Sequence, residues 1–195
     1  MTKRLIARIL SLALLLLVSG CAGHRGARTT YHDPNMDFGL IQSVAVLPFE
    51  NLSPAARAGE SVREVFSTTL QASGAVYVHP PGEVRRAIVR VNPQDPKSPT
   101  PEEVVELAQN IGADVVITGV VLEYGQIRSS AASANVCSVS LKMIEGQTGR
   151  VVWSASATTG GVGASERLLG GGGQPMNIVV SQAVQDLLNR LFEGV

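Results

Sequence analysis

The sequence of 195 residues predicts a single α/β domain in which helices flank one mixed β-sheet. Apolar runs of strand length alternate along the chain with apolar stripes at helical spacing. Two strand patterns in the C-terminal half are joined by a short turn, as expected for an antiparallel hairpin. The predicted order of elements is β-α-β-α-α-β-β-β-α.

The first 20 residues have the features of a secretory signal peptide. Lys3, Arg4 and Arg8 form a basic region, and the apolar run 9–18 follows it. This run is shorter than the about 20 residues that cross a bilayer. A transmembrane helix is the alternative, but it would place the basic residues in the hydrocarbon. The sequence therefore predicts a cleaved signal at 1–20.

The signal ends in Val18, Ser19, Gly20 and Cys21, which resembles the lipobox of bacterial lipoproteins. In that family the cysteine thiol receives a diacylglycerol, the chain is cleaved before the cysteine, and the new amino terminus is acylated. The resemblance implies that Cys21 is the lipid attachment site, and three acyl chains would hold the protein permanently to a membrane. Because Ala22 rather than aspartate follows the cysteine, the resemblance also implies the periplasmic face of the outer membrane.

The charge balance and the cysteine content bear on nucleic-acid binding and on disulfide bonds. The chain has 16 basic and 16 acidic side chains, and removal of the signal with its three basic residues leaves 13 against 16, a net charge of −3. This balance gives no indication of nucleic-acid binding. Once Cys21 carries lipid, Cys137 is the only free thiol, so no intrachain disulfide is expected. The fold must therefore be held together by its core.

The lipidated cysteine is followed by a segment without hydrophobic periodicity. Residues 21–41 contain several Gly, Pro, Asn and Asp residues and few apolar ones, which predicts a flexible tether with a reach of about 25 Å. The periplasmic α/β domain is predicted at 42–195. It begins with the nearly continuous apolar run 43–49, which is typical of a strand covered on both faces.

The next elements are predicted from helical spacing and from helix-terminal residues. A helix carries apolar side chains at helical spacing and ends at Gly74, and a second strand follows at 75–79. Its apolar stripe consists of Val62, Val65, Phe66 and Leu70. A second helix is expected at 81–91. After a proline-rich break, a third helix begins at Pro101 with Thr100 as its N-cap.

The C-terminal half predicts three strands and a last helix. The most apolar stretch, 113–128, is expected to be the central strand. Cys137 lies on the apolar face of the next strand, which a turn joins to 151–159. In that last strand one face is expected to carry Trp153, Ala155 and Ala157, and the other, wet face Val152, Ser154 and Ser156. A final helix is expected from about Pro175 to Phe192, with its apolar stripe on the sheet.

No pattern indicates catalysis, a metal or a cofactor. The three histidines, His24, His32 and His79, lie far apart and lack metal-ligand spacing. No G-x-S-x-G motif is present. The glycine-rich loop 160–174 lacks the Lys-Ser/Thr of a phosphate-binding motif. We therefore expect no enzyme activity, no cofactor and no metal.

Three stretches carry a family resemblance: VAVLPFENLS (44–53), GADVVITGVVLEYG (112–125) and VSLKMIEGQTGRVVWS (139–154). They resemble the superfamily of envelope lipoproteins that includes the curli secretion lipoprotein, the lipoprotein activators of penicillin-binding proteins and flagellar outer-membrane lipoproteins. They are also similar to the amino-terminal domain of the Tol-Pal translocation protein. The resemblance implies a periplasmic module that binds other proteins and lacks an active site.

The first functional hypothesis is a non-enzymatic outer-membrane lipoprotein that supports assembly or function of an envelope complex through protein contacts. Its expected partners are the membrane, through the lipid, and an envelope protein or a second copy of the chain. The alternatives are a curli-type secretion channel subunit, an unrecognised ligand-binding module and a hydrolase. The links 129–134 and 160–174 are too short or too glycine-rich for membrane-spanning hairpins, whose strands need about 9–11 residues each.

Leu168 and Leu169, between glycines in the loop 160–174, are candidate partner contacts. Two interpretations stay open: the pair folds back onto the domain, or it stays exposed and inserts into a partner. Replacing both with serine should lower the melting temperature in the first case. In the second case it should weaken partner capture at an unchanged melting temperature. A variant that keeps both properties would contradict both interpretations.

Cys21→Ala should abolish lipidation, because only the thiol can form the thioether. In cells labelled with palmitate, we expect the variant to remain an uncleaved and unlabelled precursor. Cys137→Ala is the matched control and should be labelled like the wild type. Equal palmitate incorporation by the Cys21 variant would refute the lipoprotein prediction.

Overall fold

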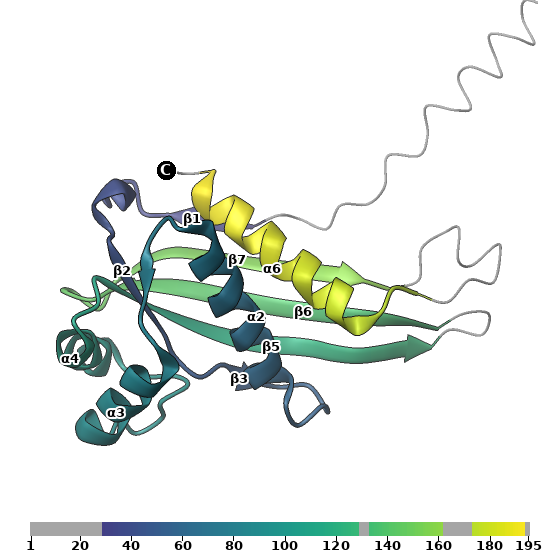
Figure 1. Ribbon diagram of the computed structural model, residues 1–195, viewed down its shortest axis with the longest axis horizontal. Helices are drawn as coiled ribbons and strands as arrows, with labels where there is room; N and C mark the ends of the chain where they lie inside the picture. Colours follow the sequence, from purple (N-terminus) through teal and green to yellow (C-terminus); the bar gives the residue numbers. More distant parts are fainter. Residues whose placement is uncertain (1–28, 129–132, 162–172, 194–195) are drawn as a thin grey trace, which may run out of the picture.

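The computed structural model describes residues 29–128, 133–161 and 173–193 (Figure 1). The strands are β1 Thr30–His32, β2 Ser43–Val46, β3 Glu50–Asn51, β4 Tyr77–Val78, β5 Val115–Arg128, β6 Ser133–Glu145 and β7 Val151–Gly160. The helices are α2 Ala58–Ser73, α3 Pro81–Val91, α4 Pro101–Ile111 and α6 Met176–Phe192, with a short 3-10 helix, η1 Phe38–Leu40. The predicted single α/β domain is confirmed, and β1, η1 and β3 add to the predicted order.

All seven strands belong to one mixed sheet with the order β1-β7-β6-β5-β2-β4, and β3 pairs with β5 beyond the end of β2. Pairing is parallel between β2 and β4 and where β2 and β3 meet β5. It is antiparallel from β5 through β6 and β7 to β1. β5 therefore joins a parallel half to an antiparallel half, which confirms its predicted central position.

Helices cover the two faces of the sheet unequally. Figure 1 shows α2 and α6 side by side across one face of the long strands. Their apolar stripes bury Phe66 and Leu187 together with Trp153 of β7 in the larger core cluster. On the other face, α3 and α4 bury Val84 and Leu107 in a smaller cluster. That smaller cluster reaches only β2 and the near ends of β5 and β6, so the rest of this face lacks a covering helix within the described residues.

The helix ends follow the predicted signals. Thr100 and Glu103 form a capping box at the start of α4, with Pro101 in the first turn. Gly74 and Gly112 terminate α2 and α4 in the left-handed conformation that favours glycine. The predicted apolar stripe of α6 is fully buried: Val180, Ala183, Val184, Leu187, Leu188 and Leu191.

The predicted wet face of β7 is wrong at one residue. Val152 is 0% exposed and lies in the same core cluster as Trp153. The register shifts here, because Trp153 pairs with Met143 while Val151 pairs with Ile144. This irregularity leaves Val152 without a partner on β6 and turns two consecutive side chains into the core. Strict alternation cannot anticipate such a bulge.

The predicted tether is also ordered over much of its length. Thr30–His32 pair with Trp153, Ser154 and Ala155 as β1, and η1 follows at Phe38–Leu40. Asp33 is buried, and its carboxylate lies 3.4 Å from Arg150. The segment 30–41 is therefore part of the domain, and the tether prediction is wrong there. A three-residue strand with Tyr31 half exposed leaves almost no hydrophobic pattern to detect.

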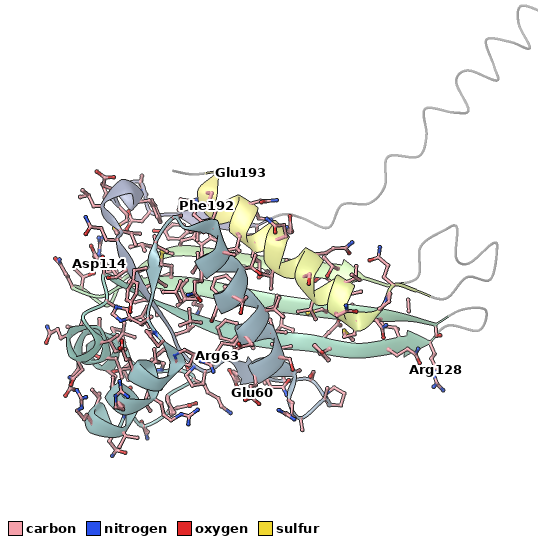
Figure 2. The ribbon with its side chains drawn as sticks, in the orientation of Figure 1. Glu60, Arg63, Asp114, Arg128, Phe192 and Glu193 are labelled. Atoms are coloured by element: carbon pink, nitrogen blue, oxygen red, sulfur yellow. The ribbon has the colours of Figure 1, made fainter. Side chains whose placement is uncertain are left out.

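One carboxylate fixes the start of β2 against the start of β5. Oδ2 of Asp114 accepts hydrogen bonds from the backbone amides of Gln42 and Ser43 and from the Ser43 hydroxyl, each at 2.9 Å. Figure 2 shows Asp114 at this end of the sheet. Desolvation opposes ionisation, but the three hydrogen bonds outweigh it and lower the pKa of Asp114 below its ordinary value of 3.8. The contact sets the parallel register in which Val44 lies opposite Val115.

We expect Asp114→Asn to lower the free energy of unfolding by about 1 kcal/mol at most, since the site is exposed and a neutral amide accepts these bonds less well. For a chain of this size the melting temperature should fall by about 2–4 °C. A carboxylate with a lowered pKa contributes stability above pH 3.8, and this contribution is lost as the pH falls through the folded-state pKa.

Urea unfolding of wild type and variant at about pH 7 and about pH 2.5 tests both points. The stability difference should be present at the first pH and shrink at the second. Glu106→Gln removes an exposed carboxylate on α4 and serves as the control, with no expected effect. A difference that persists unchanged at low pH would contradict the role of the ionised carboxylate.

Candidate interaction surfaces

The three residues singled out from the sequence, Cys21, Leu168 and Leu169, lie outside the described residues. Their roles in lipid attachment and partner contact stay predictions. The described chain begins at residue 29, and β1 begins nine residues after Cys21. Because β1 is antiparallel to β7, the chain leading to Cys21 leaves the domain next to the outer edge of β7.

The remaining thiol is inert by position. Cys137 is 0% exposed in the larger core cluster. Burial raises the pKa of its thiol to about 11, which keeps it protonated at neutral pH. Reactive cysteines have lowered pKa values and solvent access. The expected role of Cys137 as a small core residue agrees with this environment.

The two described histidines are built into packing. Nδ1 of His79 lies 3.2 Å from Glu83 Oε2, and its ring packs edge-on against Tyr77. His32 packs between Phe38 and Trp153. No group of three potential metal ligands occurs in the described part of the chain. None of the helices described is both long and apolar enough to cross a bilayer.

Hydroxyl groups line the open face of β6 and β7. Ser138 and Thr158 are 2.8 Å apart at their side-chain oxygens, and Ser156 donates to Ser140 at 3.0 Å. These bonds join residues that lie directly opposite each other in the antiparallel register. Each hydroxyl is thus paired with another hydroxyl and with no described base, so the arrangement supports cross-strand pairing and offers no activated nucleophile.

An apolar cavity of about 170 Å³ lies where η1 meets the ends of α2 and α6. Phe38, Leu70, Met143 and Phe192 are among its lining residues. Its volume is below the roughly 300 Å³ at which small-molecule pockets begin. We therefore interpret it as a packing gap beneath η1.

Two strand edges are unpaired at the far end of the sheet. On one side, β1 covers β7 only at 153–155, and Nη1 of Arg190 donates to the Ser156 carbonyl at 2.8 Å. On the other side, β2 and β3 cover β5 only up to Val121. Residues 156–160 of β7 and 123–128 of β5 therefore have no neighbouring strand on their outer sides among the described residues.

The two edges lie at the same level of the sheet. Glu123 of β5 is opposite Ser138 of β6, which is opposite Thr158 of β7. In Figure 1 these strand ends project beyond β3 and α2. An edge with free amide and carbonyl groups is a template for a further strand. The projection thus offers two such templates on opposite sides.

A groove runs around the junction between β2 and β3. Three adjacent cavities, of about 190, 280 and 200 Å³, share lining residues. Pro48 and Arg63 line the first and second, and Lys97 lines the second and third. Arg85 lies at one end and Lys142 at the other. We call these three neighbouring cavities together the cationic groove.

Neither the cationic groove nor the unpaired strand edges have a contiguous signal in the sequence. The cations of the groove come from α2, α3, the loop before α4 and β6, so no local charge run marks them. The unpaired edges depend on which strands end early, which the sequence of β5 or β7 alone does not reveal. The proline-rich segment 92–101, predicted as a break between helices, was the one available signal near the groove.

The chain matches one protein family and resembles several solved structures. The family described as "Putative lipoprotein GNA1162-like" matches residues 39–193. A variant of PelC from Paraburkholderia phytofirmans, solved as a dodecamer, is 22% identical, with a TM-score of 0.58 over 85% of this chain and 97% of that chain. Lipoprotein GNA1162 from Neisseria meningitidis is 19% identical, with a TM-score of 0.56 over 78% and 99%.

The C-terminal domain of LpoB from Salmonella enterica is 15% identical, with a TM-score of 0.48 over 65% of this chain and 86% of that chain. No curated protein sequence matches the chain. The predicted resemblance to envelope lipoproteins is confirmed by the family match.

Proposed function

The chain belongs to the GNA1162-like lipoprotein family, and on this premise we propose that it is a lipid-anchored envelope protein that acts through protein contacts and self-associates. The anchor is Cys21, and the location is the periplasmic face of the outer membrane, as Ala22 after the cysteine favours. The buried thiol of Cys137 and the histidines held in packing contacts support a role that does not involve catalysis. The proposed role is to support assembly or function of an envelope complex.

The pair of unpaired strand edges carries the proposal of self-association. One copy's β5 edge, 123–128, can continue the sheet with a second copy's β7 edge, 156–160. The two edges lie on opposite sides of each copy, so the contact is heterologous and repeats from copy to copy. Repetition closes into a ring if each step rotates suitably. The dodecamer of the similar protein PelC supports such a closed assembly.

The anchor geometry is compatible with this arrangement. β1 pairs with β7 only at 153–155, the part nearest the turn, and no described strand pairs with the projecting part of that edge. Arg190 already satisfies the Ser156 carbonyl, so new pairing would begin at Thr158. Membrane attachment of every copy would also place the copies in one plane, which raises their effective concentration.

Cysteine crosslinking tests the edge contact in the intact envelope. Glu123→Cys and Thr158→Cys, combined in one lipidated chain, should give a ladder of disulfide-linked oligomers after mild oxidation. The two positions are separated by β6 within one copy, about 10 Å, which is too far for an intramolecular disulfide. Each single variant should give dimers at most, because a heterologous contact supplies each position only once per interface.

Glu123→Cys combined with Ser181→Cys, on the exposed face of α6, is the matched control and should give no ladder. Native mass spectrometry of the lipidated wild type in detergent measures the assembly independently. An oligomer by mass without a crosslinked ladder would reject the strand edges as the contact. A monomer by mass over the accessible concentration range would reject self-association.

A further inference from the structure

The cationic groove carries more positive charge than the chain as a whole would suggest. Arg63, Arg85, Lys97 and Lys142 line its three cavities, against Glu50 and Glu60. The exported chain has an excess of acidic over basic side chains. Figure 2 shows Arg63 and Glu60 at the beginning of α2. Positive charge is therefore concentrated along this groove on a chain that is acidic overall.

These four cations are available for a ligand. None of them takes part in an ion pair within the described part of the chain. Glu60 is engaged by Arg57 at 3.6 Å, which leaves Glu50 as the one lining carboxylate without a described ion pair. Unpaired cations along a low-dielectric wall attract anionic groups and increase their association rate.

The walls of the groove are rigid and partly apolar. Pro48, Pro81, Pro96, Pro99 and Pro101 line the cavities. Proline fixes the backbone dihedral φ and has no amide proton, so these walls lose little entropy when a ligand binds. The proline rings, Ile88 at one end and Val151 at the other supply the accessible apolar surface, while Val84, Val104 and Ile144 are buried behind them. Cations are thus spaced between aliphatic surfaces along a shape formed before binding.

We propose that the cationic groove binds an extended segment of a partner protein in which acidic and apolar side chains alternate along each face. Acidic side chains would pair with Arg63, Lys97 and the cations at either end. Apolar side chains would cover the aliphatic surfaces between them. An extended strand points successive side chains in opposite directions, so a groove of spaced sites can accept every second one.

Other occupants fit the groove less well. The segment 21–28 of this chain carries Arg25, Arg28 and His24 and no acidic residue, so it would be repelled. An anionic glycan would satisfy the cations and would find hydroxyl partners at Ser98, Thr118 and Ser140, but it would place its other hydroxyl groups on the proline rings, Ile88 and Val151, which accept no hydrogen bond. A peptide with apolar side chains avoids this cost.

The inference rests on the proposed function only in assigning protein contacts to this lipoprotein. The groove and the strand edges have no residue in common. Loss of peptide binding without loss of oligomers, or the reverse, separates the two proposals experimentally.

Fluorescence anisotropy with the full lipidated chain in detergent tests the groove. The probe is a labelled ten-residue peptide in which pairs of glutamates alternate with pairs made of one valine and one proline, so that acidic and apolar side chains alternate along each face. Its counterpart has lysines in place of the glutamates. We expect the acidic peptide alone to bind. Raising the salt concentration from about 50 mM to about 300 mM should weaken binding severalfold.

Charge reversal locates the site. Arg63→Glu with Lys97→Glu should weaken binding at least about tenfold, or about 1.4 kcal/mol. Arg86→Glu with Arg90→Glu is the matched control, because these exposed cations of α3 lie outside the cavities and the net charge changes equally. It should change the dissociation constant by less than about twofold. The milder pair Arg63→Gln with Lys97→Gln removes the two charges without reversing them. If its melting temperature is unchanged, weaker binding by this variant reflects the lost charges and not misfolding.

Equal weakening by both charge-reversed pairs would overturn the proposal, because binding would then follow net charge alone. Failure of the acidic peptide to bind better than the basic one would also overturn it. Alginate is the polysaccharide probe. If alginate binds the wild type as tightly as the peptide and is lost in the same double variant, the groove is a glycan site and the peptide proposal is wrong.

Discussion

The mismatch in length between β5 and its parallel neighbours determines the architecture. β5 pairs with β6 over its full length, from Val115 opposite Glu145 to Arg128 opposite Ser133. On its other side, β2 and β3 together reach only Val121. A register shift between Val121 and Glu123 marks the point where support from both sides ends. The compact half of the domain and its projecting half follow from this one difference.

The compact half is held by close contacts that the long strands make possible. Gly119 lies where β5 passes beneath Phe49, and a Cβ there would come within 2.6 Å of Leu141 and 2.8 Å of the Phe49 ring. The missing side chain lets Phe49 pack on the sheet and reach Phe66 of α2, with ring centroids 6.2 Å apart. The junction of β2 and β3, which forms one wall of the cationic groove, is fixed by this packing.

Much of the fold could be predicted, because its elements carry strong local signals. The Thr100 cap, the helix-ending Gly74 and the apolar stripe of α6 each act through neighbouring residues. β1 and the bulge at Val152 could not be predicted, because both depend on pairing between segments more than 100 residues apart or on a local loss of alternation. The candidate surfaces depend further on tertiary structure, since Arg63 and Lys142 meet one groove only after the sheet has formed. Cys21, in contrast, is predicted from a contiguous motif.

The attachment of β1 at the sheet edge has a mechanical consequence. Any tension between the membrane and a bound partner would enter the domain through Thr30 and act on three residue pairs with β7. Asp33 reinforces this clamp, because its amide donates to the Val152 carbonyl at 2.8 Å and its carboxylate pairs with Arg150. If these contacts broke under load, residues 30–41 would span at most about 40 Å when fully extended. The contacts between β1 and β7 would thus break before the rest of the sheet, which limits the force that reaches it.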